Sequence, residues 1–329
     1  MTSRTVHIKK AEPPRLGALC LALLLFFSLA LMLRRADIAT DSMRKGLALC
    51  ARAIVPSLFP FMVLSELLVA TGAGEYLTVP LARPLGKLLG LSRAGCSAIV
   101  LGLLCGFPVG ARCAILSREK GTMARAECER VLACSSIPSS AFLISTVGTT
   151  LWKNAKFGMF LYFCTVLAAL LSGILLYVLQ KRRKGEQTKL VYPSATKVHF
   201  EASMLPSAVK NATVSTLLIC AYVVFFSTLT GTVEVVLGRF AANEATHALL
   251  ASLLELSGGI SAAAGLANRR LAAILTGAAV GWSGLSIHCQ MLSLCDGHDL
   301  STRPYLAAKL MQMILCSAMM FLFSPTILK

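Results

Sequence analysis

Long apolar runs separated by short polar and basic segments make up most of the chain. A helix needs about 17 to 25 apolar residues to cross a bilayer, and several of these runs reach that length. The pattern predicts an all-α, polytopic integral membrane protein with seven to nine membrane segments, some of them incomplete. The runs cover residues 17–33, 47–70, 96–117, 131–148, 155–180, 208–229, 246–264, 271–293 and 304–328.

Two of these segments carry small and polar residues in their middle, where a helix that only crosses lipid needs none. Segment 277–293 contains two central glycines followed by Ser, His and Gln, and segment 101–117 contains a Gly-Phe-Pro-Val-Gly sequence. The two segments align without gaps at an offset of 176 residues, which pairs Cys113 with Cys289. Paired interrupted segments in two halves indicate a transporter-type binding site. We therefore expect two pseudo-symmetric halves that contain broken or re-entrant helices.

Three further segments are predicted to be interrupted. Pro56 and Pro60 should bend or break the second run, because proline removes a backbone donor and obstructs a helix. Four serines surround Pro138 at 135–140, which predicts a re-entrant hairpin tip or an unwound helix. Glu255 precedes a Gly-Gly pair, so we expect a charged side chain beside a helix break there.

Charge and polarity divide the chain into four parts. The run at 17–33 lacks a small-residue cleavage site, so it is expected to remain as an anchor. The Lys-Arg-Arg-Lys sequence at 181–184 marks a cytoplasmic end. The halves could be parallel or inverted repeats, and this charge cluster favours inversion. The predicted parts are an N-terminal tail with the first anchor at 1–45, a first Gate-like half at 46–184, a polar linker at 185–206 and a second Gate-like half at 207–329.

Composition supports a membrane protein over the soluble classes. Hydrophobic residues make up 56% of the chain and charged residues 14%, against about 25% charged in soluble domains. The formal net charge of +17 comes from positive residues in short segments between apolar runs, which is the pattern of membrane orientation. No nucleic-acid-binding motif accompanies the charge, so nucleic acid is not an expected partner.

The sequence gives no reason to expect an enzyme, a cofactor or a metal. The 12 cysteines form no C-x-x-C pair, and most lie in apolar runs, where a reduced cysteine behaves as a small hydrophobe. Potential ligands gather at 288–299, but their spacing matches no familiar zinc site. Nucleophile-elbow, P-loop and H-E-x-x-H motifs are absent from the sequence.

Five motifs in order resemble one known family. In this order they are Pro56-Ser57-Leu58-Phe59-Pro60-Phe61; Gly106-Phe107-Pro108-Val109-Gly110-Ala111; Glu127 and Glu129 ahead of Pro138, Phe142 and Val147-Gly148; Leu254-Glu255-Leu256-Ser257-Gly258-Gly259-Ile260; and Gly284-Leu285-Ser286-Ile287-His288-Cys289-Gln290.

Over about residues 45–327 the chain resembles the sporulation integral membrane protein family of the YlbJ type. This family belongs to the nucleoside recognition or Gate-domain group, which is related to the gates of concentrative nucleoside and ferrous-iron transporters. The resemblance implies a multi-pass protein of a bacterial cell membrane with a role in sporulation, which in the family is cortex formation. The chain departs from the family by placing Ser135 and Ser136 where asparagines are usual.

Four ionisable residues are candidates for a binding site within the membrane. Glu66 and Glu255 lie in apolar segments, where a charge usually faces a cavity or a partner. For Glu255 the alternatives are a solute or proton site and a structural pair with an arginine, and Glu66 could instead lie at the interface. Arg112 and His288 are predicted to occupy equivalent places after the two glycine breaks, near helix N-termini that could hold an anion or a polar ligand.

Backbone breaks and neutral polar side chains complete the predicted site. Unwound backbone exposes carbonyl and amide groups that can bind a solute or ion. Hydroxyl and amide side chains could add donors and acceptors, although each one alone more often makes an interhelical hydrogen bond. The remaining candidate residues are Pro108, Gly110, Ser136, Ser139, Ser257, Gly258, Ser286 and Gln290.

Two functions are consistent with these features. The first is a transporter-like protein that binds or moves a small polar solute, nucleoside-like by analogy, at the broken helices. The second is a membrane scaffold that recruits other sporulation proteins without transport. The lipid bilayer is a partner in both cases, and a homo-oligomer remains open.

Overall fold

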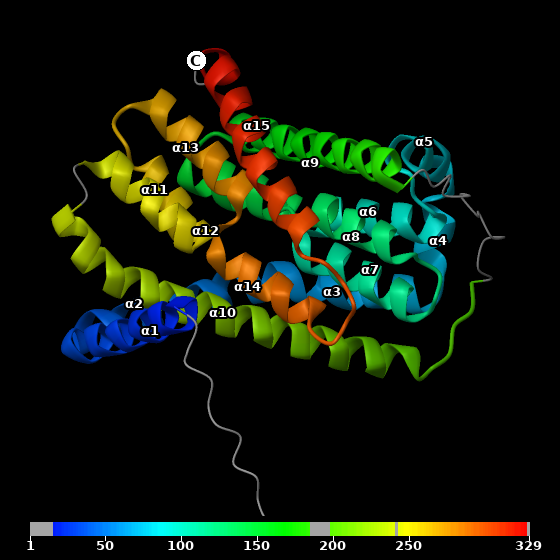
Figure 1. The fold of residues 1–329 in the computed structure, drawn as a ribbon, viewed down its shortest axis with the longest axis horizontal. Helices are drawn as coiled ribbons and strands as arrows, with labels where there is room; N and C mark the ends of the chain where they lie inside the picture. The colour runs from blue at the N-terminus through cyan, green and yellow to red at the C-terminus, as the bar shows by residue number, and fades with distance from the viewer. Residues whose placement is uncertain (1–15, 185–197, 241–242, 328–329) are drawn as a thin grey trace, which may run out of the picture.

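The computed structural model describes residues 16–184, 198–240 and 243–327, and every regular element within these ranges is a helix (Figure 1). Four helices are long and apolar enough to cross a membrane, or five if α5 (Val79–Leu89) and α6 (Arg93–Cys105) form one span with a 100° bend. An all-α, multi-pass membrane protein is thereby confirmed. The predicted tail at 1–15 and most of the predicted linker lie outside the described residues.

Two of the described elements, η1 and η2, are π-helical, and the others are α-helical. The remaining elements are α1 (Leu16–Arg34), α2 (Ala36–Leu49), η1 (Cys50–Ile54), α3 (Val55–Ala70), α4 (Ala73–Leu77), α7 (Phe107–Glu119), α8 (Arg125–Ser135), η2 (Phe142–Leu151), α9 (Ala155–Lys184), α10 (Met204–Phe240), α11 (Glu244–Leu254), α12 (Leu256–Ala264), α13 (Arg269–Trp282), α14 (Gly284–Cys295) and α15 (Arg303–Ile327).

A long antiparallel helix pair forms one side of the molecule (Figure 1). One partner is the continuous helical stretch α2–η1–α3, and the other is α10. Glycines allow close packing: a Cβ on Gly46 would lie 3.2 Å from the Val224 backbone, and one on Gly231 would lie 2.0 Å from the Ser42 hydroxyl. The same pair continues to the other end, where the His199 amide donates to the Thr71 carbonyl.

The predicted proline break in this stretch is wrong. Pro56 lies in the first turn of α3 and Pro60 lies inside it, yet the helix continues through both residues. The five-residue π-helix η1 immediately precedes α3. A π-helical adjustment can relieve backbone groups that a proline leaves without a helical partner, so the chain needs no full interruption.

The first half contains a helical hairpin, an interrupted helix and a long helix. Helices α6 and α7 fold back on each other at Gly106, whose φ is +96°. A Cβ on Gly102 would lie 2.9 Å from the Cα of Gly110, so this hairpin depends on two facing glycines. Helix α8 then ends at Ser135, and non-helical residues 136–139 separate it from the helical turns that lead into η2 and α9.

The second half repeats this arrangement. Helices α11 and α12 form a hairpin with Glu255 at its tip, and a Cβ on Gly259 would lie 2.3 Å from the Cα of Ser252. Helices α13 and α14 are interrupted at Ser283 and Gly284, whose φ values are +75° and +79°. They nevertheless continue in nearly one direction and together form one candidate span. Helix α15 follows as the long helix.

The two repeats are inverted. Helices α9 and α15 pack antiparallel, since Asn154 at the start of α9 contacts Ile327 at the end of α15. Further along, the Gln312 amide donates to the Ser172 hydroxyl at 3.0 Å. Inversion was the arrangement favoured by the charge pattern.

The repeat register predicted from the sequence is wrong. The alignment at an offset of 176 equated 101–117 with 277–293, but the first segment is a hairpin and the second an extended, interrupted helix. In the structure Gly106 corresponds to Glu255, and the interruption at 136–139 corresponds to Ser283 and Gly284. Both kinds of break use glycine and serine, so composition alone could not distinguish a tip from an interruption.

The described residues contain four or five candidate full-length spans, so several of the seven to nine predicted segments are incomplete. The apolar stretches Leu58–Ala70 and Phe142–Leu151 are shorter than a bilayer requires. The hairpin helices, of 13, 13, 11 and 9 residues, are also too short, because each hairpin turns back near the centre of the molecule. Several apolar runs therefore end inside the protein and do not cross it.

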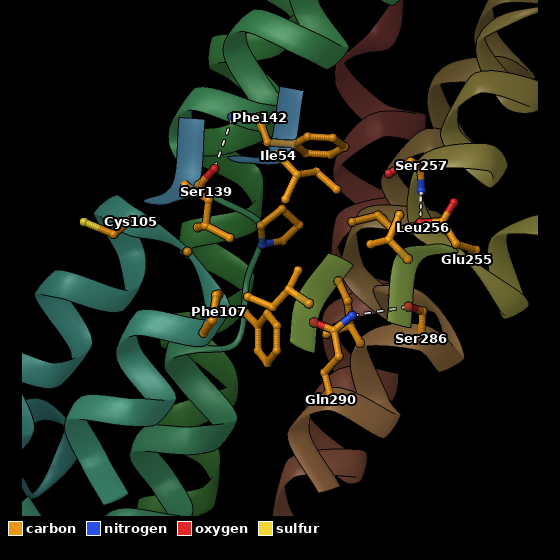
Figure 2. Close-up of a pocket in the computed structure, with 17 residues that line it drawn as sticks. Ile54, Cys105, Phe107, Ser139, Phe142, Glu255, Leu256, Ser257, Ser286 and Gln290 are labelled. Atoms are coloured by element: carbon orange, nitrogen blue, oxygen red, sulfur yellow. Dashed lines mark hydrogen bonds between the residues drawn. The ribbon is translucent and has the colours of Figure 1, made fainter. Parts of the chain in front are cut away.

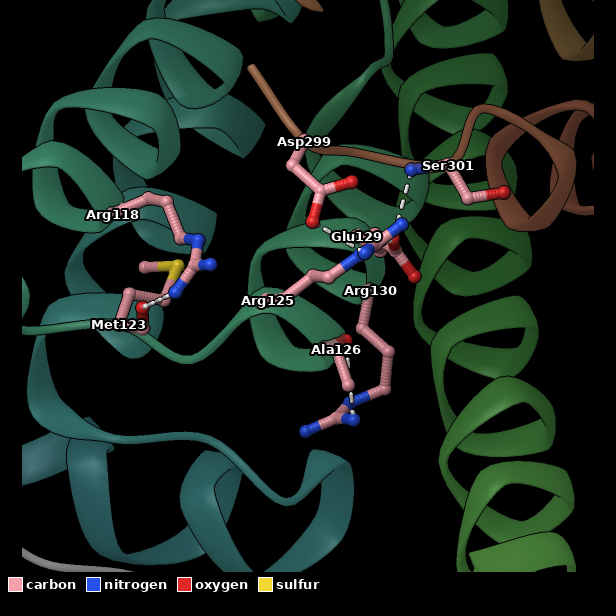
Figure 3. A network of polar contacts seen from close by, with 8 residues as sticks. All are labelled: Arg118, Met123, Arg125, Ala126, Glu129, Arg130, Asp299 and Ser301. Carbon is pink, nitrogen blue, oxygen red and sulfur yellow. Dashed lines mark hydrogen bonds and ion pairs between the residues drawn. The ribbon is translucent and has the colours of Figure 1, made fainter.

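Basic residues and their partners connect the elements at one end of the molecule (Figure 3). Arg125 contacts Glu129 at 3.1 Å and Asp299 at 2.6 Å, and the Ser301 amide donates to Glu129. Arg130 reaches the end of α9 through Gln180. The predicted cytoplasmic cluster at 181–184 lies at this same end, which we call the basic end.

Candidate functional site

Both hairpin tips, the interruption before η2 and the first turns of α14 line one internal cavity (Figure 2). The cavity has a volume of about 120 Å³, and we call it the inner cavity. In each half the hairpin tip touches the interruption that follows it: a Cβ on Gly106 would lie 2.9 Å from the Ser139 nitrogen, and one on Gly284 would lie 2.9 Å from the Leu256 nitrogen. Segments far apart in the sequence thus meet at one point.

Glu255 forms the tip of the second hairpin and caps the helix that follows. Its carboxylate oxygens accept hydrogen bonds from the amides of Ser257 at 2.9 Å and Gly258 at 2.7 Å. A carboxylate at this position satisfies amides that have no intrahelical partner and is stabilised by the positive end of the helix dipole. Within the described residues Glu255 has no arginine partner, so the predicted alternative of a structural ion pair is not observed.

The first hairpin contributes backbone and small side chains to the cavity. Gly106 and Pro108 lie at the start of α7 and line the cavity, and a Cβ on Gly106 would contact Ser139. The Ser139 hydroxyl accepts a hydrogen bond from the Phe142 amide, which begins η2. Because Gly106 has positive φ and almost no free space, only glycine fits at this tip.

Helix α14 contributes Ser286 and Gln290 to the opposite wall. The Gln290 amide nitrogen lies 3.3 Å from the Ser286 hydroxyl (Figure 2). The buried Gln290 carbonyl oxygen has no hydrogen-bond partner. A buried polar atom without a partner is costly unless a water or ligand satisfies it, so this oxygen is available to a solute.

His288 lies on the same helix but away from the inner cavity. Its Nδ1 is 2.7 Å from the Tyr305 hydroxyl, and its ring packs against Trp282. The structure therefore places His288 in the contact between α14 and the start of α15. Its Nε2 is buried and also lacks a hydrogen-bond partner.

Arg112 and Glu66 form a separate cluster between α7 and α3. The Arg112 Nε is 2.7 Å from a Glu66 carboxylate oxygen, and the Asn211 amide nitrogen lies 3.4 Å from the other oxygen. The predicted equivalence of Arg112 and His288 is wrong, because the segments that carry them are not equivalent in the repeat. The cavity beside this ion pair has a volume of only about 10 Å³, roughly the lower limit for one water.

Three other predicted residues lie near the interruptions in different roles. Gly110 packs against Gly102 and Ser135 inside the first hairpin. Ser136 is fully buried, and its hydroxyl donates to the Leu132 carbonyl. Gly258 does not line the inner cavity but lines a second cavity on the other side of the same hairpin.

This second cavity was not anticipated from the sequence. It has a volume of about 400 Å³ and lies between η2, the α11–α12 hairpin and the helices α2 and α10; we call it the outer cavity. Phe142, Glu255 and Ser257 line both cavities, so the two spaces meet at the tip of the second hairpin. Its polar residues lie on helices far apart in the sequence, and no local pattern could have grouped them.

Lys309 is the second feature of the site that was not predicted from the sequence. Its side chain is completely buried in α15, and its ammonium donates to the Ser136 carbonyl at 2.7 Å and to the Gln312 side-chain oxygen at 3.0 Å. No carboxylate partner of Lys309 is found among the described residues. A lysine within the last apolar run was a signal in the sequence, because ionisable residues inside membrane segments are rare and functional.

Metal-ligating side chains do not cluster in the part of the chain that the structure describes. Most residues around the inner cavity are apolar, and its polar side chains are Ser139, Glu255, Ser257, Ser286 and Gln290. Serine, threonine, lysine and glutamate line the outer cavity together with apolar residues. Such a lining can hold a polar solute through hydrogen bonds.

The fold and the cavities define a class of protein: a multi-pass membrane protein in which inverted repeats of hairpins and interrupted helices enclose an internal cavity lined by apolar residues and a few polar side chains. The chain is 23% identical over 345 residues to the sporulation integral membrane protein YlbJ of Bacillus subtilis (strain 168), across 94% of this chain and 84% of that protein. This similarity confirms the predicted resemblance to the YlbJ-type family and supports a sporulation membrane protein. No protein-family profile matches the chain, and no solved structure matches it.

Proposed function

We propose that this protein binds a small polar solute at the inner cavity and carries it across the membrane during sporulation. The convergence of two hairpin tips, the interruption at 136–139 and the start of α14 on one cavity carries the proposal. Discontinuous membrane helices occur in transporters where half-helix ends and free backbone groups hold the solute. The protein acts as a carrier and not as an enzyme, since the cavity lining offers hydrogen-bond donors and acceptors without a nucleophile–base pair.

Unequal access from the two sides supports transport over static binding. The inner cavity adjoins the outer cavity of about 400 Å³ at Glu255. Toward α3 and α7 the nearest space is the cavity of about 10 Å³ beside the Glu66–Arg112 pair, and it shares no lining residue with the inner cavity. A site that is open to one side and closed to the other is one state of an alternating-access cycle.

The biological role follows from the relative and from this mechanism together. A sporulating cell moves small molecules between compartments separated by membranes, and a carrier of this kind would serve that exchange. The contribution to cortex formation that the family resemblance implies would then depend on the transported solute. A non-transporting scaffold would leave the polar lining of the cavities without a purpose.

Complementation of a Bacillus subtilis strain that lacks the similar protein tests the proposal. The wild-type chain should restore spore formation, and Gln290→Ala and Glu255→Gln should restore it poorly at normal protein levels. A matched control is Gln180→Ala, because Gln180 lies at the basic end and far from both cavities. Full complementation by both cavity variants would instead favour the scaffold.

A ligand screen on purified protein in nanodiscs gives a second, independent readout. A solute that binds only the folded state must raise the melting temperature. Nucleosides, metal ions and peptidoglycan precursors form a suitable panel. A stabilising solute should lose its effect in Gln290→Ala, and its flux into proteoliposomes would establish transport.

A further inference from the structure

We propose that the solute is a small cation that enters through the outer cavity and is neutralised by Glu255. This inference rests on the proposed transport function and specifies the charge of the solute. It draws on the chemistry of the outer cavity, the charges along the path and the position of Glu255 between the two spaces.

The outer cavity is a polar chamber of suitable size for a solute. Its volume is about 400 Å³, within the range of roughly 300–1,000 Å³ typical of ligand pockets. The buried Thr230 hydroxyl has no hydrogen-bond partner, although Thr230 lines this chamber and is only 5% exposed. An unsatisfied hydroxyl at this depth indicates a place for a solute or an ordered water. The hydroxyl residues that line the chamber are Ser42, Thr146, Ser227, Thr230, Ser257 and Ser261.

Negative charge dominates the place where the outer cavity meets the inner cavity. Among the described residues that line the inner cavity, Glu255 is the one charged side chain, and it is 5% exposed. Its hydrogen bonds to the amides of Ser257 and Gly258 leave lone pairs on both oxygens free, because a carboxylate offers about four acceptor sites. A cation that reaches this point gains a partner, whereas an anion meets a like charge in a poorly solvated space.

Positive charge at the mouth of the outer cavity is already neutralised. Lys45 is largely exposed and lies 2.7 Å from Asp41, whose hydrogen bond and negative charge raise the pKa of Lys45. Glu234 adds a second carboxylate at the mouth, 3.6 Å from His247. Among the described residues that line the outer cavity, Lys45 is the one cation. Because it is already paired with Asp41, an anion finds no free positive charge there.

Helix dipoles do not reverse this balance. Each of the four chain breaks at or beside the inner cavity presents the C-terminus of one helix and the N-terminus of the next, so their partial charges of opposite sign largely offset. At the second hairpin the N-terminus of α12 is occupied by the Glu255 carboxylate itself. The sequence predicts that half-helix ends could hold an anion. Binding of an anion is least favourable at this hairpin tip.

Charged thiol reagents test the proposal without knowledge of the natural solute. In nanodiscs, a Ser257→Cys variant is treated with methanethiosulfonates that carry a trimethylammonium group, a sulfonate group or no charge. Peptide mass spectrometry then measures the labelling rate at position 257 separately from the native cysteines. Each charged reagent is normalised to its own rate with a free thiol.

The cationic reagent should react faster than the anionic one at position 257. Adding Glu255→Gln should slow the cationic reagent about five-fold and speed the anionic reagent by a similar factor, the scale expected for one charge at a distance of about 8 Å in a medium of intermediate polarity. The matched control Glu244→Gln removes an acid at the start of α11, away from both cavities, and should leave the ratio unchanged.

The labelling results distinguish a failure of the transport proposal from a failure of the cation assignment. Labelling by the neutral reagent shows that water reaches Ser257, so the outer cavity is open as the transport proposal requires. In Ser257→Cys with Glu255 intact, a ratio that favours the sulfonate reagent would overturn the cation assignment even if Glu255→Gln failed to fold. Equal ratios with and without Glu255→Gln would overturn the role of Glu255, and a cavity closed to all three reagents would contradict the access route itself.

Discussion

The Arg112 guanidinium lies 2.7 Å from the Glu66 carboxylate and joins α7 of the first hairpin to α3 of the long helix pair. Asn211 of α10 reaches the same carboxylate, so three helices meet at this point. The space between them is closed. The ion pair thus holds the hairpin against the long helices on the side of the inner cavity opposite the outer cavity.

We expect Arg112→Gln to loosen this closure. Glu66 would lose its charged partner, at a cost of about 1–3 kcal/mol for a charge-assisted hydrogen bond. Cys113, which lines the small cavity beside the pair, should react faster with a water-soluble maleimide, as measured by peptide mass spectrometry. The double variant Glu66→Gln/Arg112→Gln should recover part of the melting temperature, because two neutral amides can bond to each other. Unchanged labelling of Cys113 in Arg112→Gln would contradict the closing role.

Adjacent glycines in α12 should respond differently to alanine. A Cβ on Gly259 would lie 2.3 Å from the backbone of Ser252, whereas a Cβ on Gly258 would meet only the Glu255 carboxylate at 3.4 Å. Gly259→Ala must therefore separate the two helices of the hairpin and should lower the melting temperature by several degrees. Gly258→Ala should be tolerated, since alanine favours a helix over glycine by about 1 kcal/mol. Equal effects of the two substitutions would contradict the observed hairpin packing.

Loss of the cap at Glu255 should be visible in amide exchange. Glu255→Ala leaves the amides of Ser257 and Gly258 without their acceptor, which typically costs about 1 kcal/mol. These two amides should exchange faster with deuterated water, while the first turn of α13 should not change. Glu255→Asp keeps a carboxylate and should restore part of the protection. Exchange at the start of α12 that is identical in all three proteins would exclude the capping role.

We expect Lys309 to lower the stability of the folded protein and to be required for sporulation. Its ammonium is fully buried without a described carboxylate partner, and an uncompensated buried charge costs more than its two hydrogen bonds return. Lys309→Met preserves the volume and removes the charge, so we expect a higher melting temperature together with loss of sporulation in the complementation assay. Lys210→Met, on the exposed surface of α10, should change neither. A lower melting temperature in Lys309→Met would show that the lysine is a structural donor.

Much of the secondary structure followed from local pattern. Breaks at Gly106, Glu255 and Ser283–Gly284 were expected from glycine, proline and charge within apolar runs, and the structure has them. The break expected at Pro56 and Pro60 failed because a π-helical turn before α3 accommodates the prolines. Local residue types thus indicate where a helix is weak, but the neighbouring turns decide whether it separates.

The candidate site was only partly predictable for a related reason. Of the residues proposed from sequence, Pro108, Ser139, Glu255, Ser257, Ser286 and Gln290 line the inner cavity. Glu66 and Arg112 pair with each other elsewhere, and His288 contacts Tyr305. A polar residue in an apolar run must find a partner inside the protein, but the sequence does not say whether that partner is a side chain or a solute.

The sequence by itself determined the membrane class, the helical content and most of the chain breaks, because apolar length, glycine, proline and charge act over a few residues. Tertiary structure decided which breaks are hairpin tips and which are interruptions, and it decided that the repeats are inverted. It also created the outer cavity and placed Lys309 beside Ser136. These features depend on contacts between segments more than 100 residues apart, whose packing no local pattern specifies.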